Sequence, residues 1–202
     1  MIEYGLIGEK LSHSYSKIMH DMLGAYRYNL HPLAPADLTS FIEDRKYKGL
    51  NVTIPYKQKV LPLCDGLDPV AEKIGAVNTL YFKGDELWGT NTDYEGFLFM
   101  ADRTGISLKN RKVLVLGSGG ASRMVQVAAS DRGAEKVSVA SRRGPLTYDN
   151  LPKDAEIIIN TTPVGMYPHV DDQPTDLSQF PNCKGVLDLI YNPGRTCLLL
   201  QA

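Results

Sequence analysis

Two polar motifs that lie far apart in the sequence each end on a side chain that can move a proton. The stretch NVTIPYK over residues 51–57 ends on the amine of Lys57, and the stretch NTD over residues 91–93 ends on the carboxylate of Asp93. A lysine and an aspartate that converge on one cleft can pass a proton to and from an alcohol or a ketone. Taken singly, a surface lysine and a turn-forming aspartate are the usual interpretations, so the prediction depends on the neighbouring motifs.

A glycine-rich turn, GSGGAS over residues 117–122, follows an apolar run and opens a predicted helix. Gly117 permits the tight turn, Gly119 lets the backbone approach a pyrophosphate, and the helix presents unpaired N–H groups to the negative charge. Ser122 stands where the dinucleotide fingerprint has Gly or Ala, so a plain strand-to-helix turn is the alternative. Proton transfer beside a dinucleotide indicates hydride transfer to a small polar substrate.

The end of the next predicted strand distinguishes NADP from NAD. An acidic residue there would bind the ribose hydroxyls of NAD, but this chain has Ser141, Arg142 and Arg143. Two guanidinium groups beside a hydroxyl suit a 2′-phosphate, which planar forked donors bind well. A solvated basic turn is the alternative. The pattern favours NADP.

Several hydroxyls precede a predicted helix in the first half of the chain. Ser14 and Ser16 lie in the stretch SHSYS and could donate hydrogen bonds to a substrate carboxylate, although an N-cap cluster is the simpler interpretation. Asn78 is a further polar residue flanked by strand-like sequence. His13 and His20 could share a helix face, but nothing supplies a third ligand, so we predict no metal site.

The composition is that of an ordinary globular protein. The chain has 202 residues, 43% of them hydrophobic, and a net charge of −1 with scattered Lys and Arg, which argues against a nucleic-acid or membrane surface. Three cysteines without a CxxC pair argue against a disulfide framework or a zinc site. The N-terminus does not resemble a signal peptide, and no apolar run approaches the roughly 20 residues of a membrane helix. We expect a cytoplasmic protein that is a monomer or a homodimer and binds neither nucleic acid nor membrane.

Strands and helices alternate along both halves, which predicts an α/β layer structure. In the first half, the expected strands cover residues 4–7, 26–30, 49–54, 77–82 and 87–89, and the expected helices cover residues 16–23, a stretch opening at residue 35, and 94–104. In the second half, the expected strands cover residues 113–116, 137–140, 157–159 and 186–189, with a helix over 124–129. Strand, glycine turn, helix and strand form the unit that binds a mononucleotide half.

The motifs occur in an order that resembles the shikimate dehydrogenase family, from Tyr4 to about Leu200. They are LSHS at 11–14 with Ser16, NVTIPYK at 51–57, GAVNT at 75–79, NTD at 91–93, GSGGAS at 117–122, NTTPVGM at 160–166 and DLIY at 188–191. The resemblance implies NADP-dependent, reversible reduction of 3-dehydroshikimate to shikimate in chorismate and aromatic amino-acid biosynthesis. It also implies a substrate-binding catalytic domain over residues 1–104 and a Rossmann-like NADP-binding domain over residues 105–202.

The resemblance further implies a role for each candidate residue. Lys57 would carry the proton, with Asp93 as its partner. The substrate carboxylate would be held by Ser14 and Ser16, the ring hydroxyls by Thr53, Lys57, Asn78 and Asp93, and the cleft would be lined by Tyr191. NADP would be held by Gly117, Ser118, Gly119, Gly120, Ala121, Ser141, Arg142 and Arg143, with Thr161, Thr162 and Leu189 beside its ribose and nicotinamide.

Two features depart from the family pattern. Lys17 stands where a proline is frequent, and the chain ends at Ala202 within an apolar helical pattern where family members continue. We therefore expect the second domain to be truncated at its C-terminus, and we assign no substrate role to Gln201. The alternatives are a quinate or aminoshikimate dehydrogenase, and a truncated non-catalytic paralogue that binds a shikimate-like ligand.

Overall fold

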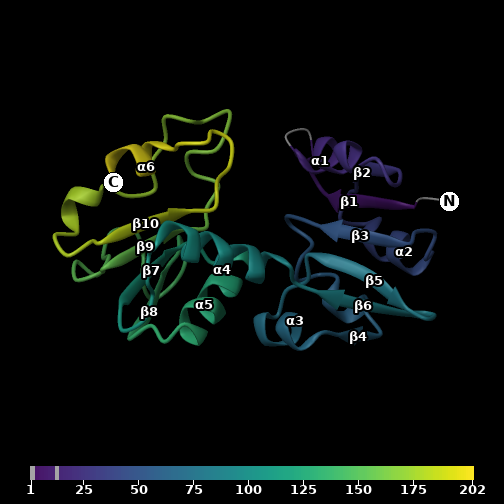
Figure 1. The fold of residues 1–202 in the computed structure, drawn as a ribbon, viewed down its shortest axis with the longest axis horizontal. Coiled ribbons are helices and arrows are strands. Elements are labelled where there is room, and N and C mark those ends of the chain that lie inside the picture. Colours follow the sequence, from purple (N-terminus) through teal and green to yellow (C-terminus); the bar gives the residue numbers. More distant parts are fainter. Residues whose placement is uncertain (1–2, 12–13) are drawn as a thin grey trace. The chain divides into compact units, whose positions relative to one another are not determined.

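The computed structural model describes residues 3–11 and 14–202. The chain forms two compact units, Met1–Thr92 and Asp93–Ala202, each with its own sheet (Figure 1). We expected a boundary after residue 104, whereas the second unit begins at residue 93 because helix α4 (Asp93–Thr104) packs against helix α5 (Gly120–Asp131). No helix in the described part of the chain is long and apolar enough to cross a membrane.

The first unit is built on a six-stranded sheet in the order β2-β1-β3-β5-β6-β4. Its strands are β1 (Tyr4–Gly8), β2 (Tyr28–Pro32), β3 (Gly49–Val52), β4 (Gly66–Leu67), β5 (Thr79–Lys83) and β6 (Glu86–Thr90). β1 pairs in parallel with β2 and with β3, while β5 is antiparallel to both β3 and β6. The carboxyl ends of β1, β2, β3 and β6 and the start of β5 therefore lie at one edge of this sheet.

Three helices and a 3₁₀ turn accompany this sheet: α1 (Ser16–Leu23), α2 (Leu38–Glu43), the 3₁₀ turn Leu61–Leu63, and α3 (Pro69–Ile74). Apolar residues that alternate along the strands, among them Ile7, Leu50 and Leu80, form a buried core with Leu38 and Ile42 of α2. This burial is the main source of stability for the edge that carries the polar motifs.

The second unit is a four-stranded parallel sheet in the order β10-β9-β7-β8. Its strands are β7 (Lys112–Leu116), β8 (Lys136–Ala140), β9 (Ile157–Asn160) and β10 (Gly185–Asp188), and it also contains a 3₁₀ turn (Leu177–Gln179) and helix α6 (Cys197–Gln201). The apolar run of β7 and the Ile157–Asn160 strand are almost fully buried, as the continuous apolar sequence predicts. The expected α/β class is confirmed in both units.

Candidate functional site

The polar motifs of the first unit gather at the edge where β1, β2, β3 and β6 end and β5 begins. Thr53 directly follows β3, and its N–H donates to the carbonyl of Ile7 on β1 at 2.9 Å. Asn78 directly precedes β5, whose first residue lies opposite the last residue of β6. Motifs that are dozens of residues apart in the sequence therefore meet at one edge of one sheet.

The serines that we predicted as carboxylate ligands lie where the chain enters α1. The backbone N–H of Ser16 donates to Oγ of Ser14 at 3.2 Å, and both residues are half-buried. This contact is of the capping kind, yet it uses a lone pair of Ser14 and not its hydroxyl hydrogen, which can still donate to an anion. Ser12 and His13, which belong to the same motif, lie outside the described residues.

A chain of side-chain hydrogen bonds crosses this edge, and of its four members only Asn78 was predicted as a site residue. The hydroxyl of Tyr28 donates to Oδ1 of Asn51 at 2.7 Å, and Nδ2 of Asn51 donates to Oγ1 of Thr79 at 3.2 Å. Oγ1 of Thr79 donates in turn to Oδ1 of Asn78 at 3.0 Å. Burial raises the pKa of Tyr28 to about 12, against the effect of a hydrogen bond with Ser16, so its phenol stays a neutral donor.

Asn78 continues this chain into the NTD motif. Its side chain is only 7% exposed, its Oδ1 accepts from the backbone N–H of Thr92 at 2.8 Å, and its Nδ2 donates to Oγ1 of Thr92 at 3.0 Å. The buried Asn91 donates from Nδ2 to the carbonyl of Ala76 at 2.9 Å. These contacts fix the backbone immediately before Asp93.

Lys57 and Asp93 are held by their surroundings in different ways. The carbonyl of Lys57 accepts from the N–H of Val77 at 2.7 Å, which ties the lysine motif to the GAVNT motif, and the Lys57 side chain is half-buried. Asp93 is the first residue of α4, where the helix dipole favours a carboxylate. Lys57 belongs to the first unit, and Asp93 opens the second.

The predicted cofactor residues of the second unit lie at the carboxyl edge of its parallel sheet. One of them follows each of the strands directly: Gly117 after β7, Ser141 after β8, Thr161 after β9 and Leu189 after β10. Ligands of open α/β sheets bind outside this edge. Tyr191, two residues beyond Leu189, is 60% exposed.

The glycine turn has the geometry that its sequence requires. Gly117 has φ of +108°, and a Cβ there would lie 2.7 Å from Oγ1 of Thr161, so a larger residue would be strained in both respects. A Cβ at Gly119 would meet nothing within 4 Å, and α5 starts after Gly119 without a side-chain cap. Ser122 is fully buried and accepts from Nε2 of Gln126 at 3.1 Å, which explains how serine fits the Gly or Ala position.

The basic turn after β8 is compact and exposes its charges. The N–H of Ser141 donates to the carbonyl of Leu146 at 3.0 Å, and the side chains of Arg142 and Arg143 are exposed. A Cβ at Gly144 would lie 2.6 Å from Oγ of Ser141, so the turn closes tightly on that hydroxyl.

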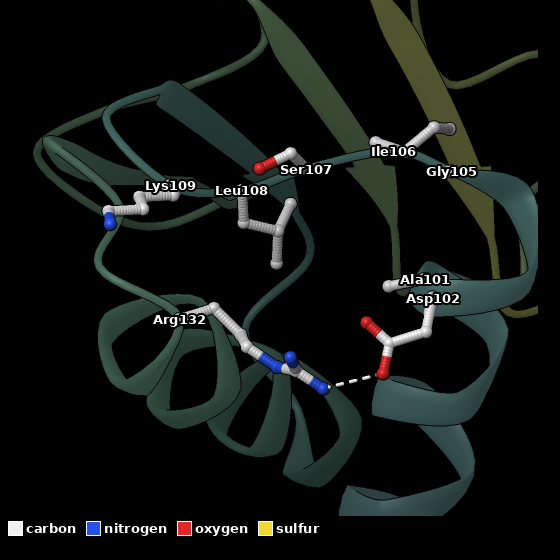
Figure 2. A pocket seen from close by; sticks show the side chains of 8 residues that line it. All are labelled: Ala101, Asp102, Gly105, Ile106, Ser107, Leu108, Lys109 and Arg132. Carbon is white, nitrogen blue, oxygen red and sulfur yellow. Dashed lines mark hydrogen bonds and ion pairs between the residues drawn. The ribbon is translucent and has the colours of Figure 1, made fainter.

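A surface pocket of about 360 Å³ lies at the opposite edge of the second sheet (Figure 2). It is lined by Ala101, Asp102, Gly105, Ile106, Ser107, Leu108, Lys109 and Arg132. Arg132 at the end of α5 pairs with Asp102 of α4 at 2.7 Å across it. The lining residues precede β7 or follow α5, so this pocket is separate from the glycine turn. Within residues 3–11 and 14–202, no group of three or more His, Cys, Asp or Glu could hold a metal ion.

Known proteins resemble this chain over nearly all of its length. The family model of the shikimate dehydrogenase substrate binding domain matches residues 6–80. A shikimate dehydrogenase (NADP(+)) of Clostridium beijerinckii is 40% identical over 219 residues, which cover 97% of this chain and 80% of that protein.

Solved structures give the same result. A chorismate mutase/shikimate 5-dehydrogenase fusion protein from Clostridium acetobutylicum has a TM-score of 0.90 at 38% identity, covering 100% of this chain and 82% of that one. A shikimate 5-dehydrogenase from Thermus thermophilus, crystallised with NADP(H) and shikimate, has a TM-score of 0.85 at 32% identity. The match covers 100% of this chain and 84% of that one.

Proposed function

The chain belongs to the shikimate dehydrogenase family, and from this premise we propose that most of the substrate-binding residues lie in its first unit and the NADP-binding residues in its second unit. The activity is the NADP-dependent, reversible reduction of 3-dehydroshikimate to shikimate in the shikimate pathway. One observation supports the division most strongly. In each unit, the residues of the family motifs gather at a single edge of its sheet, the edge at which the parallel strands end.

For the substrate, the hydroxyls of Ser14 and Ser16 are proposed to hold the carboxylate. Ser14 precedes α1 and Ser16 is its first residue. The serine hydroxyls and the positive end of the helix dipole therefore both favour the substrate carboxylate. Thr53, Lys57, Asn78 and Asp93 are proposed to hold the ring hydroxyls. Asn78 is suited to this role because its second amide hydrogen is not needed for the contacts to Thr92. Tyr191 is proposed as a further substrate-binding residue, and its side chain is exposed.

For the chemical step, Lys57 is proposed as the proton carrier and Asp93 as its partner. When bound, NADPH supplies the hydride for the carbonyl carbon of 3-dehydroshikimate. The ammonium group of Lys57 gives a proton to the carbonyl oxygen, which becomes the hydroxyl of shikimate. In the reverse direction, neutral Lys57 takes this proton back. The proton that Lys57 gives up is replaced from solvent before the next turnover, and Asp93 is proposed to assist Lys57 in this exchange.

For the cofactor, the backbone from Gly117 through Ser118, Gly119 and Gly120 to Ala121 is proposed to hold the pyrophosphate at the start of α5. Ser141, Arg142 and Arg143 are proposed to hold the 2′-phosphate, because guanidinium groups bind it bidentately. Thr161, Thr162 and Leu189 are proposed to lie beside the ribose and the nicotinamide.

The free thiols Cys64, Cys183 and Cys197 suit a reducing compartment, and we propose a cytoplasmic location.

Replacement of Lys57 tests the proton carrier. We expect Lys57→Ala to lower kcat for NADPH formation from shikimate by a factor of about 10²–10⁴, which is the range typical of a lost general acid–base group. The matched control is Lys59→Ala, because Lys59 is an exposed lysine in the same turn. NADPH is followed by its absorbance at saturating shikimate. Turnover by Lys57→Ala equal to that of Lys59→Ala would refute the assignment.

A further inference from the structure

Three buried polar residues at the carboxyl ends of β9 and β10 form one hydrogen-bonded unit. Asn160 is 0% exposed, Asp188 8% and Thr196 1%. Asn160 and Asp188 are the last residues of their strands and lie opposite each other in the parallel pair. Nδ2 of Asn160 donates to Oδ1 of Asp188 at 3.1 Å, and the hydroxyl of Thr196 donates to Oδ2 of Asp188 at 2.7 Å.

Asp188 is a buried carboxylate that is satisfied by neutral donors. Besides the contacts to Asn160 and Thr196, its Oδ1 accepts from the backbone N–H of Ile190 at 3.0 Å. Among the described residues, no Lys or Arg forms an ion pair with Asp188. A buried charge without a cation depends on the donors aimed at it. The geometry of these donors is therefore tightly constrained by Asp188.

The same unit fixes the loop that follows β9. Oδ1 of Asn160 accepts from the N–H of Thr162 at 3.0 Å and from its hydroxyl at 2.7 Å. Oγ1 of Thr162 then accepts from the N–H of Val164 at 3.2 Å. On its other side this loop contacts the glycine turn, because a Cβ at Gly117 would lie 2.7 Å from Oγ1 of Thr161 and 3.0 Å from Cγ2 of Thr162.

Thr196 joins the start of α6 to this arrangement. Its Oγ1 accepts from the N–H of Leu199 at 3.4 Å as the N-cap of the helix, while its hydrogen is donated to Asp188. Gly165, with φ of +95°, brings the end of the β9 loop close to the same residue, since a Cβ there would lie 3.6 Å from Cβ of Thr196. Two loops and a helix start therefore depend on one carboxylate.

We propose that Asn160, Asp188 and Thr196 are positioning residues for the cofactor: the buried Asp188 carboxylate sets the loop after β9 and the segment after β10 in the conformation that accepts NADP. The proposal deepens the proposed function and rests on the assignment of Thr161, Thr162 and Leu189 to the cofactor side. None of the three positioning residues needs to touch NADP. Their effect passes through Thr162 to the loop beside Gly117, and through Ile190 to the segment that carries Leu189 and Tyr191.

Thr196→Val is the test, because valine keeps the shape of threonine and removes the hydroxyl that Asp188 accepts from. We expect the Kd for NADP, measured by calorimetry, to rise about tenfold, on the scale of one lost hydrogen bond to a charged group. The Kd for shikimate is expected to stay within about twofold of the wild-type value, because changes at one site have little effect on a separate site. Hydrogen exchange of the unliganded protein is expected to accelerate in residues 161–166 and 189–192.

Two variants serve as controls. Thr196→Ser keeps the hydroxyl and is expected to bind NADP with the wild-type Kd. Thr175→Val removes the hydroxyl of another buried threonine in the second unit. This hydroxyl accepts from Gln179 at 2.7 Å and makes no hydrogen bond with Asp188, so the variant is expected to leave NADP binding unchanged. If Thr196→Val does not fold by circular dichroism, Asp188→Asn replaces it, since that change keeps the size of the side chain.

The outcomes separate this proposal from the proposed function. An unchanged Kd for NADP in Thr196→Val, with only a lower unfolding temperature, would mean a purely structural role and would overturn the inference. Equal losses in Thr196→Val and Thr196→Ser would also overturn it, because the hydroxyl would then not be the cause. A wild-type protein that binds NADP but forms no NADPH from shikimate would instead overturn the proposed function, and the effect of Thr196→Val on binding would still decide the inference.

Discussion

Asn78 illustrates how one side chain can serve both the backbone and the proposed substrate. Its oxygen accepts from the N–H of Thr92, and its nitrogen donates to the hydroxyl of the same residue. The amide of Asn78 therefore fixes the position of Thr92, the residue before Asp93. The oxygen also accepts from Thr79. The orientation of the amide is thereby set, and its remaining hydrogen has a defined direction for a ligand hydroxyl.

Removal of the Thr92 hydroxyl tests this orientation. Thr92→Val retains the backbone contact but leaves Nδ2 of Asn78 without its acceptor, so we expect the KM for shikimate to rise about five- to tenfold, the equivalent of one hydrogen bond. The KM for NADP is expected to change less than about twofold, and Thr92→Ser is expected to behave as wild type. Steady-state kinetics with each substrate varied in turn supplies the comparison.

Thr104→Val is the matched control for this series, since Thr104 is the last residue of α4 and its hydroxyl donates to the carbonyl of Ala101 in the same helix. A parallel rise of both KM values in Thr92→Val would show that the variant disturbs more than the substrate side. No change in either value would remove Asn78 from the proposed substrate ligands.

The sequence identifies some members of these polar groups and misses others for a physical reason. Lys57, Asn78, Asp93 and Gly117 lie in short motifs whose order along the chain the family resemblance identifies. Tyr28 lies in a strand of mixed composition and belongs to none of the motifs, and the β2-β1-β3 pairing brings its hydroxyl to Asn51. The three-residue unit around Asp188 likewise depends on long-range strand pairing, which no local pattern reports.

At the level of elements, continuous or alternating apolar runs predict most strands and helices correctly. α1 has the expected bounds, and the strands of the second sheet differ from expectation by about one residue at each end. β4, with two residues, is too short to leave a pattern, and the six-residue α3 was missed although Asp68 and Pro69 are typical of a helix start. The boundary between units could not be read locally, because the packing of α4 on α5 decides it.

Glu156, the residue before β9, connects three segments at the amino edge of the second sheet. Its Oε1 accepts from Nζ of Lys184 at 2.6 Å and from Arg111 at 2.9 Å, and its Oε2 accepts from the backbone N–H of Lys112 at 3.1 Å. The Lys184 hydrogen bond, followed by the Lys112 N–H, lowers the pKa of Glu156 from 4.5 to about 2. This network therefore favours the folded state only while Glu156 is ionised.

The depressed pKa of Glu156 predicts the sign of a pH effect. A carboxyl group with a lower pKa in the folded state contributes stability above its unfolded pKa of 4.5, and the contribution is lost as pH falls toward 2. We expect Glu156→Gln to lower the free energy of unfolding at pH 7 and to flatten its decline over this window. Urea unfolding followed by circular dichroism between pH 7 and pH 2 measures both effects.

Glu135→Gln is the control for this measurement, because Glu135 is an exposed glutamate that precedes β8 at the same edge of the sheet. It is expected to follow the wild-type pH profile. If Glu156→Gln loses no stability at neutral pH relative to this control, the surface network contributes nothing measurable, as many exposed ion pairs do.

At the level of the whole molecule, each of the two units has its own sheet and its own buried core. The first unit carries the polar motifs proposed for the substrate, with Asp93 as the first residue beyond it, and the second carries the glycine turn and the basic turn. Such a division makes the response to each ligand separable, because a ligand stabilises most strongly the segments that it contacts.

Hydrogen exchange with each ligand alone tests this division in the complete chain. Shikimate is expected to slow exchange in residues 14–16, 51–57, 76–79 and 91–93, and NADP is expected to slow it in residues 117–122, 141–144 and 161–166, because bound ligands reduce local opening. Quinate in place of shikimate and NAD in place of NADP are the matched ligands, and each is expected to protect the same segments less at equal concentration. Protection of the glycine turn by shikimate alone, or of residues 51–57 by NADP alone, would contradict the assignment of these two segments to different ligands.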